Sequence, residues 1–317
     1  MLTPTLTLGP MSATATTVRF HPSGRLVATG TLGGAVALWD AQTGREVSTY
    51  EFAGKNMRSV IFSPDGTLVA YGGHGRWIRV REVTTGKLVH DLVRRPHLVN
   101  DLAISPSGEL LASAEAAEGQ GGTRQWRRGE IHVWRVSDLR EVVVFTLDSE
   151  AIKASAVAFS PDGRAIAGGG ADISLLMLWD IASRTPLWKA EPHLEWTATL
   201  AFSPDGRILA SAGDDGAVQL WSVAGGSRLA TLAGNQVAGK TFQPFVTAIS
   251  FRPDGRLLAS GSYGYDKTIR LWDMETAREI EKIEFDNDVL SVAFSPDGQV
   301  IAYGTRNEPV RLWRLDN

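Results

Sequence analysis

The chain of 317 residues contains no cysteine, which excludes disulfide frameworks, thiolate nucleophiles and cysteine-based zinc sites. It has no run of eighteen apolar residues, and its start, MLTPTLTLGPMSATATT, lacks the basic and apolar regions of a signal peptide. Lys and Arg total 32 against 35 Asp and Glu, a net charge of −3, so no large basic field is available for a phosphate backbone. We therefore expect a cytoplasmic protein that binds neither nucleic acid nor a membrane.

Catalytic motifs are also lacking. There is no H-E-x-x-H, no G-x-S-x-G and no phosphate-binding loop. The histidines are scattered along the chain without the paired spacing that a metal ion needs: His21, His74, His90, His97, His132 and His193. The sequence thus predicts no catalytic, cofactor-binding or metal-binding residues, no cofactor and no enzymatic activity.

What the sequence does contain is a repeat. An apolar residue followed by any residue, Pro, any residue and Gly occurs seven times, and the apolar residues are Phe20, Phe62, Ile104, Phe159, Phe202, Phe251 and Phe294. The steps between them are 42, 42, 55, 43, 49 and 43 residues. A second mark follows each by 19 to 30 residues, at Trp39, Arg81, Trp134, Trp179, Trp221, Trp272 and Trp313. Recurrence at a fixed period of this length is typical of solenoids and propellers.

The pattern inside each unit favours β-strands. Apolar residues alternate with period two, as in VAFSPDGRAIAGGG, and Pro-Asp-Gly separates two strand-like runs as a tight turn. No stretch reads as an amphipathic helix. Four short antiparallel strands in a unit of about 43 residues match one blade of a propeller. The sequence therefore predicts an all-β chain in which residues 1–317 form a single seven-bladed domain.

The phrase ISFRPDGRLLASGSYGYDKTIRLWD, echoed by LAFSPDGRILASAGDDGAVQLWS, resembles the WD repeat of β-propellers. The Trp-Asp pair itself stands only at Trp39-Asp40, Trp179-Asp180 and Trp272-Asp273, and the hydrogen-bond network of His, Ser, Trp and Asp that the family uses is incomplete in most units. The resemblance implies a non-catalytic scaffold that binds a protein or peptide, as a subunit or regulator of a larger assembly.

The last unit ends soon after Trp313 and supplies only three strands, which would leave an open sheet edge. Residues Thr3 to Leu8 alternate like the fourth strands and precede the first unit. We predict that this N-terminal strand, about residues 3–8, completes the last blade.

Unit two has Arg81 where the other units have Trp. A charge at a buried position is costly unless it is paired. We expect either that Glu82 or another acid meets Arg81, or that this blade opens to solvent there.

Function is expected on the face that carries the loops between blades and between second and third strands, because these loops vary. The largest insertion, residues 114–130, places Trp126 beside Arg127 and Arg128, a mixture typical of interface hot spots. It is either a binding element or a surface loop whose Trp packs on the neighbouring blade.

Further aromatic residues belong to the same face. Phe242 lies in the second insertion, and Trp77, Trp196, Tyr263 and Tyr265 lie in other loops. Several of them could simply cap the cores between blades. With Arg58, Arg76 and Lys153 nearby, this face is nonetheless the predicted site for a partner: Trp77, Trp126, Arg127, Arg128, Trp196, Phe242, Tyr263 and Tyr265.

Two alternatives remain open from the sequence. A propeller enzyme or small-molecule binder would need charged groups that converge in the central channel. A reader of phosphorylated motifs would use the arginines of the loop-bearing face as a cluster.

Overall fold

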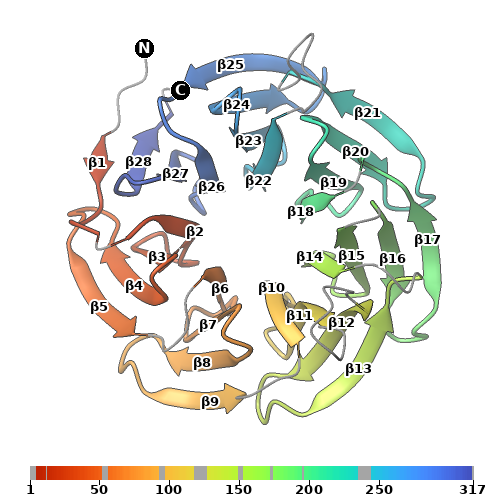
Figure 1. Cartoon of the computed structure of the whole chain (residues 1–317), viewed down its shortest axis with the longest axis horizontal. Coiled ribbons are helices and arrows are strands. Elements are labelled where there is room, and N and C mark those ends of the chain that lie inside the picture. The colour runs from red at the N-terminus through yellow and green to blue at the C-terminus, as the bar shows by residue number, and fades with distance from the viewer. Residues whose placement is uncertain are drawn as a thin grey trace.

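The computed structural model describes residues 5–11, 13–51, 56–92, 97–117, 127–148, 153–171, 174–194, 196–234 and 244–315, and only the backbone of Ala117, Arg127 and Arg128. Seven four-stranded antiparallel sheets stand in a ring (Figure 1). The predicted all-β, seven-bladed propeller is confirmed. Within these ranges no helix is long and apolar enough to cross a membrane.

Each blade runs from an inner strand near the centre of the ring to an outer strand at its outer edge (Figure 1). Blade 1 comprises β2 (Ala15–Phe20), β3 (Leu26–Thr31), β4 (Ala35–Asp40) and β5 (Glu46–Glu51). Blade 2 comprises β6 (Met57–Phe62), β7 (Leu68–Gly73), β8 (Ile78–Glu82) and β9 (Leu88–Leu92). Blade 3 comprises β10 (His97–Ile104), β11 (Leu110–Ala117), β12 (Arg127–Arg135) and β13 (Glu141–Thr146).

The remaining blades continue in the same order. Blade 4 comprises β14 (Lys153–Phe159), β15 (Ala165–Ala171), β16 (Leu176–Asp180) and β17 (Pro186–Ala190). Blade 5 comprises β18 (Thr197–Phe202), β19 (Ile208–Gly213), β20 (Val218–Ser222) and β21 (Arg228–Leu232), and blade 6 comprises β22 (Phe245–Phe251), β23 (Leu257–Tyr263), β24 (Thr268–Asp273) and β25 (Arg278–Glu284). Blade 7 comprises β26 (Val289–Phe294), β27 (Val300–Thr305), β28 (Arg311–Arg314) and β1 (Leu6–Thr7).

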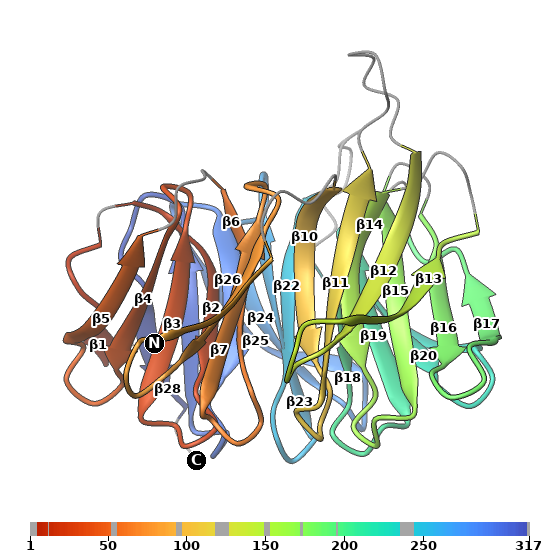
Figure 2. The ribbon, with the colours of Figure 1, turned by 90° about the horizontal axis from the view of Figure 1, so that it is seen from below.

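The two faces of the ring differ. The turns after each inner strand, such as residues 160–164, form what we call the turn face. The loops at the opposite ends of the strands, which lead into the inner strands or join second to third strands, such as residues 264–267, belong to the loop face. In Figure 2, β11 and β12 rise beyond the other strands on the loop face. The insertion at residues 114–130 therefore lengthens a hairpin of blade 3, and its tip, residues 118–126, lies outside the described residues.

The turn face is stabilised by its own side chains. In blade 4 the Ser160 hydroxyl donates to Asp162 Oδ1 at 2.6 Å, the Arg164 backbone N–H donates to the same oxygen at 3.0 Å, and Gly163 takes the left-handed conformation with φ +71°. Three other blades repeat the Ser-to-Asp bond, at Asp65, Asp205 and Asp297. These bonds hold the pKa of the Asp162 carboxyl below its usual value, led by the Ser160 hydroxyl.

Because folding lowers the pKa of Asp162, its ionised form contributes stability above the unfolded pKa, about 4, and that contribution is lost as pH falls through the folded pKa. We expect Asp162→Asn, which keeps the shape but not the charge, to be less stable than wild type at pH 7. The difference should shrink steadily below pH 4 in urea titrations. A difference that is constant from pH 7 to pH 3 would show that the charge contributes nothing.

A hydrogen bond inside several blades fixes the marker tryptophan on the third strand. Its indole N–H donates to a hydroxyl on the second strand, at 2.8 to 3.1 Å, in the pairs Trp39–Thr29, Trp134–Ser113, Trp221–Ser211 and Trp272–Ser260. In blade 5 the network continues, since His193 contacts Ser211 at 3.0 Å and Asp215 at 2.9 Å. In these four blades the buried indole N–H is thus paired, whereas the buried indole N–H of Trp313 in blade 7 has no hydrogen-bond acceptor among the described residues.

Arg81 takes the tryptophan position of blade 2 in an unexpected way. Its Nε donates to the Tyr71 hydroxyl at 2.7 Å and its Nη1 to the Gly86 carbonyl at 2.6 Å, while its guanidinium lies 4.8 Å from the centre of the Tyr50 ring. Of the two predicted alternatives, contact with an acid such as Glu82 was wrong. The guanidinium is half-buried, so it keeps part of its contact with solvent, and neutral acceptors and an aromatic face accommodate the rest. Glu82 instead accepts a bond from Thr85.

Every inner strand carries a β-bulge at the same level of the ring. Each bulged residue lies four positions before the apolar residue that opens the Pro-x-Gly phrase of its unit, as Thr16 lies before Phe20. The seven bulged residues are Thr16, Arg58, Asn100, Ser155, Ala198, Thr247 and Leu290. Four of them donate a side-chain hydrogen bond to a carbonyl of the next blade: Thr16 to Met57, Asn100 to Ala154, Ser155 to Thr197 and Thr247 to Val289. These contacts connect neighbouring blades around the channel.

The ring closes through β1, as predicted. Leu6 pairs with Leu312 and Thr7 with Arg311, and backbone N–H groups of Thr5 and Leu8 donate to Leu312 and Val310 at 2.9 and 2.8 Å. Leu8 is fully buried in a core shared by blades 1 and 7. Residues 3 and 4 of the predicted strand lie outside the described part of the chain.

Truncating Leu8 should therefore weaken the closure of the ring. We expect Leu8→Ala to lower the free energy of unfolding by about 2–5 kcal/mol, through lost burial and a residual cavity. The matched control is Leu229→Ala on outer strand β21, where the side chain is 55% exposed, and the loss should stay within about 0.5 kcal/mol. Equal effects of the two substitutions in chemical denaturation would contradict the closure model.

Candidate functional site

The central channel contains a cavity of about 290 Å³, enclosed by the inner strands of the blades. Polar bulge residues such as Thr16 and Asn100 line it, together with three charged side chains, Arg19, Arg58 and Asp101. The cavity is small for a ligand pocket. Its chemistry depends on what those charged groups already bind.

Asp101 on β10 connects three blades. Its Oδ1 accepts from the Ser59 hydroxyl of blade 2 at 3.0 Å and from the Leu102 backbone N–H at 2.9 Å, and its Oδ2 accepts from the Val157 N–H of blade 4 at 3.1 Å. Burial raises the pKa of the Asp101 carboxyl, and the Arg19 charge and these hydrogen bonds oppose that rise. Both oxygens are thus engaged with the protein, which makes Asp101 a brace between blades.

The two arginines have different positions. Arg19 is half-buried and donates through Nη1 to the Val18 carbonyl at 2.9 Å. Arg58 occupies a bulge position and is exposed to the channel. Desolvation by the surrounding strands lowers the pKa of both guanidinium groups, and Asp101 opposes the shift in each; both remain cations at neutral pH. Two positive charges against one negative leave the cavity with a surplus positive charge.

Asp101→Ala should destabilise the ring by about 1–3 kcal/mol, because two backbone N–H groups and the Ser59 hydroxyl lose their acceptor. Ser59→Ala, which removes one donor and leaves the carboxylate its backbone bonds, should cost about 1 kcal/mol or less. Urea denaturation of both variants tests this order. If Asp101→Ala were as stable as wild type, the carboxylate would not be a structural brace.

Three aromatic rings form a continuous cluster where the cavity meets the loop face. The Phe245 ring stacks on Tyr263 with centroids 5.1 Å apart and meets the Trp196 ring edge to face at 5.8 Å. All three residues line the cavity, and Trp196 is 37% exposed. Of the predicted partner-binding residues, the structure therefore brings Trp196 and Tyr263 together.

The backbone around this cluster is held by hydrogen bonds. The Trp196 N–H donates to Asp214 Oδ1 at 3.2 Å, and the Asp214 N–H donates to the Trp196 carbonyl at 3.3 Å. Gly213 permits this close approach, because a Cβ there would lie 2.0 Å from the Trp196 carbonyl oxygen. On the other side, the Gly264 N–H donates to Asp288 at 3.0 Å. Phe245 and Tyr263 themselves are paired residues at the ends of β22 and β23, so hydrogen-bonded backbone carries all three rings.

The other predicted residues lie apart from this cluster or outside the described side chains. Tyr265 is 62% exposed in the loop between β23 and β24. Trp77 is only 9% exposed, packs in a core with residues of blades 1 and 2, and has the Arg79 guanidinium 4.4 Å from its ring centre. Trp126, Phe242 and the side chains of Arg127 and Arg128 lie outside what the structure describes.

Sequence reasoning missed Phe245 as the central ring, and it missed Asp101 and Arg19 entirely. The sequence did contain a signal for Arg58. Four positions before the apolar residue of the Pro-x-Gly phrase, four units have Thr, Asn or Ser, and unit two has Arg. Asp101 lies three positions before Ile104, and Arg19 lies one position before Phe20. Comparing each repeat position around the ring would have placed all three on the channel wall.

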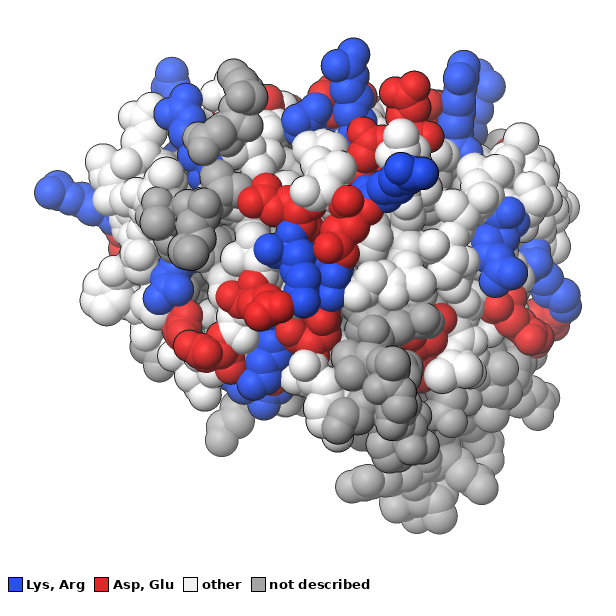
Figure 3. Space-filling model, turned by 90° about the horizontal axis from the view of Figure 1, so that it is seen from above, with Lys and Arg blue, Asp and Glu red and all other residues white. Residues whose placement is uncertain are grey.

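The side of the ring seen in Figure 3 carries a mixed distribution of charge, with Lys and Arg interspersed among Asp and Glu. A surface that holds nucleic acid presents one sign of charge over a continuous area. This side does not. The absence of nucleic-acid binding stays a prediction.

Comparison with known proteins agrees with this architecture. The WD domain, G-beta repeat family matches residues 3–40, 185–222 and 227–273. Each match begins before an outer strand, β1, β17 or β21, and ends with the third strand of the next blade. One repeat in sequence therefore supplies strands to two blades.

Two relatives share part of the chain. Protein groucho of Drosophila melanogaster is 32% identical over 157 residues, 48% of this chain and 20% of that protein. Periodic tryptophan protein 2 homolog of Schizosaccharomyces pombe is 32% identical over 103 residues, 32% of this chain and 11% of that protein. The aligned segments thus span a fifth or less of these relatives.

Seven blades of four strands, four marker tryptophans bonded to second-strand hydroxyls, and three matched repeats define its class. The chain belongs to the WD-repeat β-propeller family.

Proposed function

We propose that this propeller is a non-catalytic scaffold that binds a protein or peptide on its loop face, as a subunit or regulator of a larger assembly. The observation that carries the proposal is the cluster of Trp196, Phe245 and Tyr263 at the mouth of the channel. Exposed aromatic rings are enriched at the energetic centres of interfaces. The relatives, both larger proteins that carry matching repeats, are consistent with a scaffold built into an assembly.

Exposed apolar side chains support the choice of face. Large exposed apolar residues in the described chain fall into two sets: one on the outer strands, including Leu187 and Leu229, and one on the loop face. The loop-face set comprises Leu32, Leu194, Trp196 and Tyr265. Of these four, Trp196 also lines the cavity, and an exposed aromatic side chain beside a cavity favours docking of a partner there.

The charge of the channel indicates what the partner carries. Arg58 is exposed, lines the same cavity as the aromatic cluster and adds to the positive surplus there. An apolar or aromatic side chain on the rings and a carboxylate near Arg58 would complement both features. Because the backbone that carries the three rings is already hydrogen-bonded, these residues need little ordering on binding, which reduces the entropic cost of association.

Charged groups do converge in the channel, as the alternative of a propeller enzyme requires. The only carboxylate that lines the described cavity, Asp101, already accepts three hydrogen bonds from the protein. A general base or nucleophile needs a group that can reach the substrate. This engagement favours a structural role and hence the scaffold.

The experiment is an affinity purification from the source cells with tagged wild type, Trp196→Ala and Tyr265→Ala. We expect both variants to melt at the wild-type temperature and to lose the proteins that wild type retains. With a recovered partner, Trp196→Ala should weaken the dissociation constant at least about tenfold, equivalent to about 1.4 kcal/mol.

Matched controls are Leu187→Ala and Leu229→Ala, which remove exposed apolar side chains from the outer strands. They should retain the same proteins as wild type. If the Trp196 and Tyr265 variants also retain them, the loop face is not the binding surface. If only the outer-strand variants lose these proteins, the outer strands form the binding surface.

A further inference from the structure

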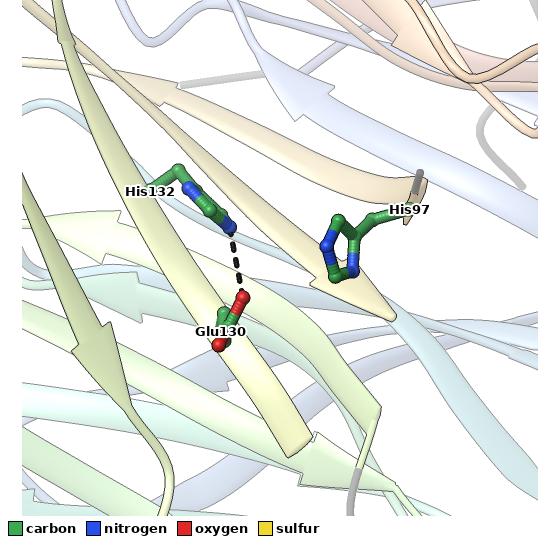
Figure 4. Close-up of side chains that lie close together, drawn as sticks. All are labelled: His97, Glu130 and His132. Carbon is green, nitrogen blue, oxygen red and sulfur yellow. Dashed lines mark hydrogen bonds and ion pairs between the residues drawn. The ribbon is translucent and has the colours of Figure 1, made fainter. Parts of the chain in front are cut away.

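A second cluster of side chains lies in blade 3, away from the residues that line the channel cavity. It comprises His97 on β10 and Glu130 and His132 on β12 (Figure 4). One potential ligand atom from each residue lies within 4.8 Å of the others, and the two imidazole rings are 5.8 Å apart between centroids. Residues on the first and third strands of one sheet thus converge across β11.

The contacts of His132 point to a cation at this place. Its Nδ1 lies 2.7 Å from Glu141 Oε2, and its Nε2 lies 3.2 Å from Glu130 Oε2. A neutral imidazole carries one N–H, and carboxylates only accept hydrogen bonds. With that proton on Nδ1, toward the nearer oxygen of Glu141, the lone pair of Nε2 faces the oxygen of Glu130. A metal ion between these two acceptors would bind both.

The surroundings of His132 match those of a metal ligand. A metal-binding histidine usually donates its other ring N–H to a carboxylate, which fixes the tautomer and the ring orientation, and Glu141 stands in that place. The ring also stacks on Trp134, with an interplanar angle of 13°. His132 is therefore held with its Nε2 aimed at the cluster.

A third carboxylate adds negative charge on the same side. Glu115 on β11 is fully buried, and its Oε2 lies 3.8 Å from His132 Nε2. The Ser113 hydroxyl donates to its other oxygen, Oε1, at 2.5 Å. Carboxylates of Glu115 and Glu130 thus flank the same nitrogen in a site that is mostly withdrawn from water, where electrostatic attraction to a cation is strong.

We propose that His97, Glu130 and His132 bind one Zn²⁺ ion, with Glu141 orienting His132 and Glu115 supplying further negative charge. Two imidazoles and a carboxylate are donors that Zn²⁺ favours over Mg²⁺ or Ca²⁺. Ligands at about 2.0–2.1 Å in a tetrahedron lie about 3.3 Å from one another, so small side-chain rotations contract the cluster around the ion. The bound ion would link β10 to β12 within blade 3.

This proposal departs from the sequence-based expectation of no metal ligand. That expectation considered spacing along the chain, and His97 and His132 belong to different strands of one blade. The side-by-side packing of those strands with β11 supplies the proximity that sequence spacing does not show. The proposed zinc site is independent of the proposed partner-binding site.

The test is calorimetric titration of ZnCl₂ into the full-length chain, without a histidine tag and after treatment with a chelator. We expect one ion per chain, and weakening of at least about tenfold in His97→Gln and Glu130→Gln. Glu141→Gln, which removes the orienting carboxylate, should weaken binding about 10- to 100-fold. His90→Gln, a histidine on β9 outside the cluster, is the matched control and should bind Zn²⁺ like wild type.

Two further measurements separate a metal site from misfolding or weak surface binding. Zn²⁺ should raise the melting temperature of wild type and of His90→Gln but not of His97→Gln, provided the variants melt like wild type without metal. Co²⁺ in place of Zn²⁺ should give visible absorption bands of a tetrahedral ion, which the His97 variant lacks. MgCl₂ should give no heat of binding.

Absence of Zn²⁺ binding by wild type at 100 µM, or affinity unchanged in His97→Gln and Glu130→Gln, would overturn the proposal. A proton on His132 would then satisfy the two carboxylates instead. Equal binding of Mg²⁺ would also overturn it, because it would mean a cluster of acids without imidazole ligation.

Discussion

The pairing of β1 with β28 is the interaction on which the rest of the structure depends. Six blades are each built from consecutive strands, but the seventh takes its outer strand from the opposite end of the chain. The strand pairing of Leu6 and Thr7, further backbone hydrogen bonds from Thr5 and Leu8, and the burial of Leu8 join the ends. Without this pairing, β28 would present an unsatisfied sheet edge, and the loops of blades 1 and 7 would lose their fixed relation to the channel.

The β-bulges of the inner strands impose a second constraint. In four blades the bulged side chain is Thr, Asn or Ser and bonds to a carbonyl of the following blade. Arg58, Ala198 and Leu290 occupy the equivalent places in the other three. At Arg58 a long cation enters the channel where other blades have a short hydroxyl or amide, so the same backbone feature serves packing in some blades and surface chemistry in another.

Repetition explains how much of this fold could be predicted from the sequence. Seven copies of a β-pattern leave few architectures, and a last unit with three strands demands a fourth from elsewhere, so the ring and its closure followed. Arg81 did not, because its partners, the Tyr71 hydroxyl and Gly86 carbonyl, depend on how β7 and the following turn pack around it. In the sequence, the acid nearest to Arg81 is Glu82. In the structure, Glu82 accepts a hydrogen bond from Thr85 instead.

The candidate sites were harder to predict, because they combine residues from different blades or strands. Trp196 and Tyr263 were chosen as loop aromatics, and Phe245, which joins them, was not among the predicted contacts. Trp77 has the same sequence signature but packs into a core, since burial of an aromatic ring is decided by its neighbours. His97 and His132 converge only after β10, β11 and β12 have paired.

The offset between repeat and blade has a consequence for how such chains change length. Each repeat contributes the outer strand of one blade and three strands of the next, so duplicating or losing a whole repeat leaves every remaining strand with a partner of the kind it had before. A gene can therefore gain or lose a unit by recombination and still encode a sealed ring, after only a small change in the angle between neighbours.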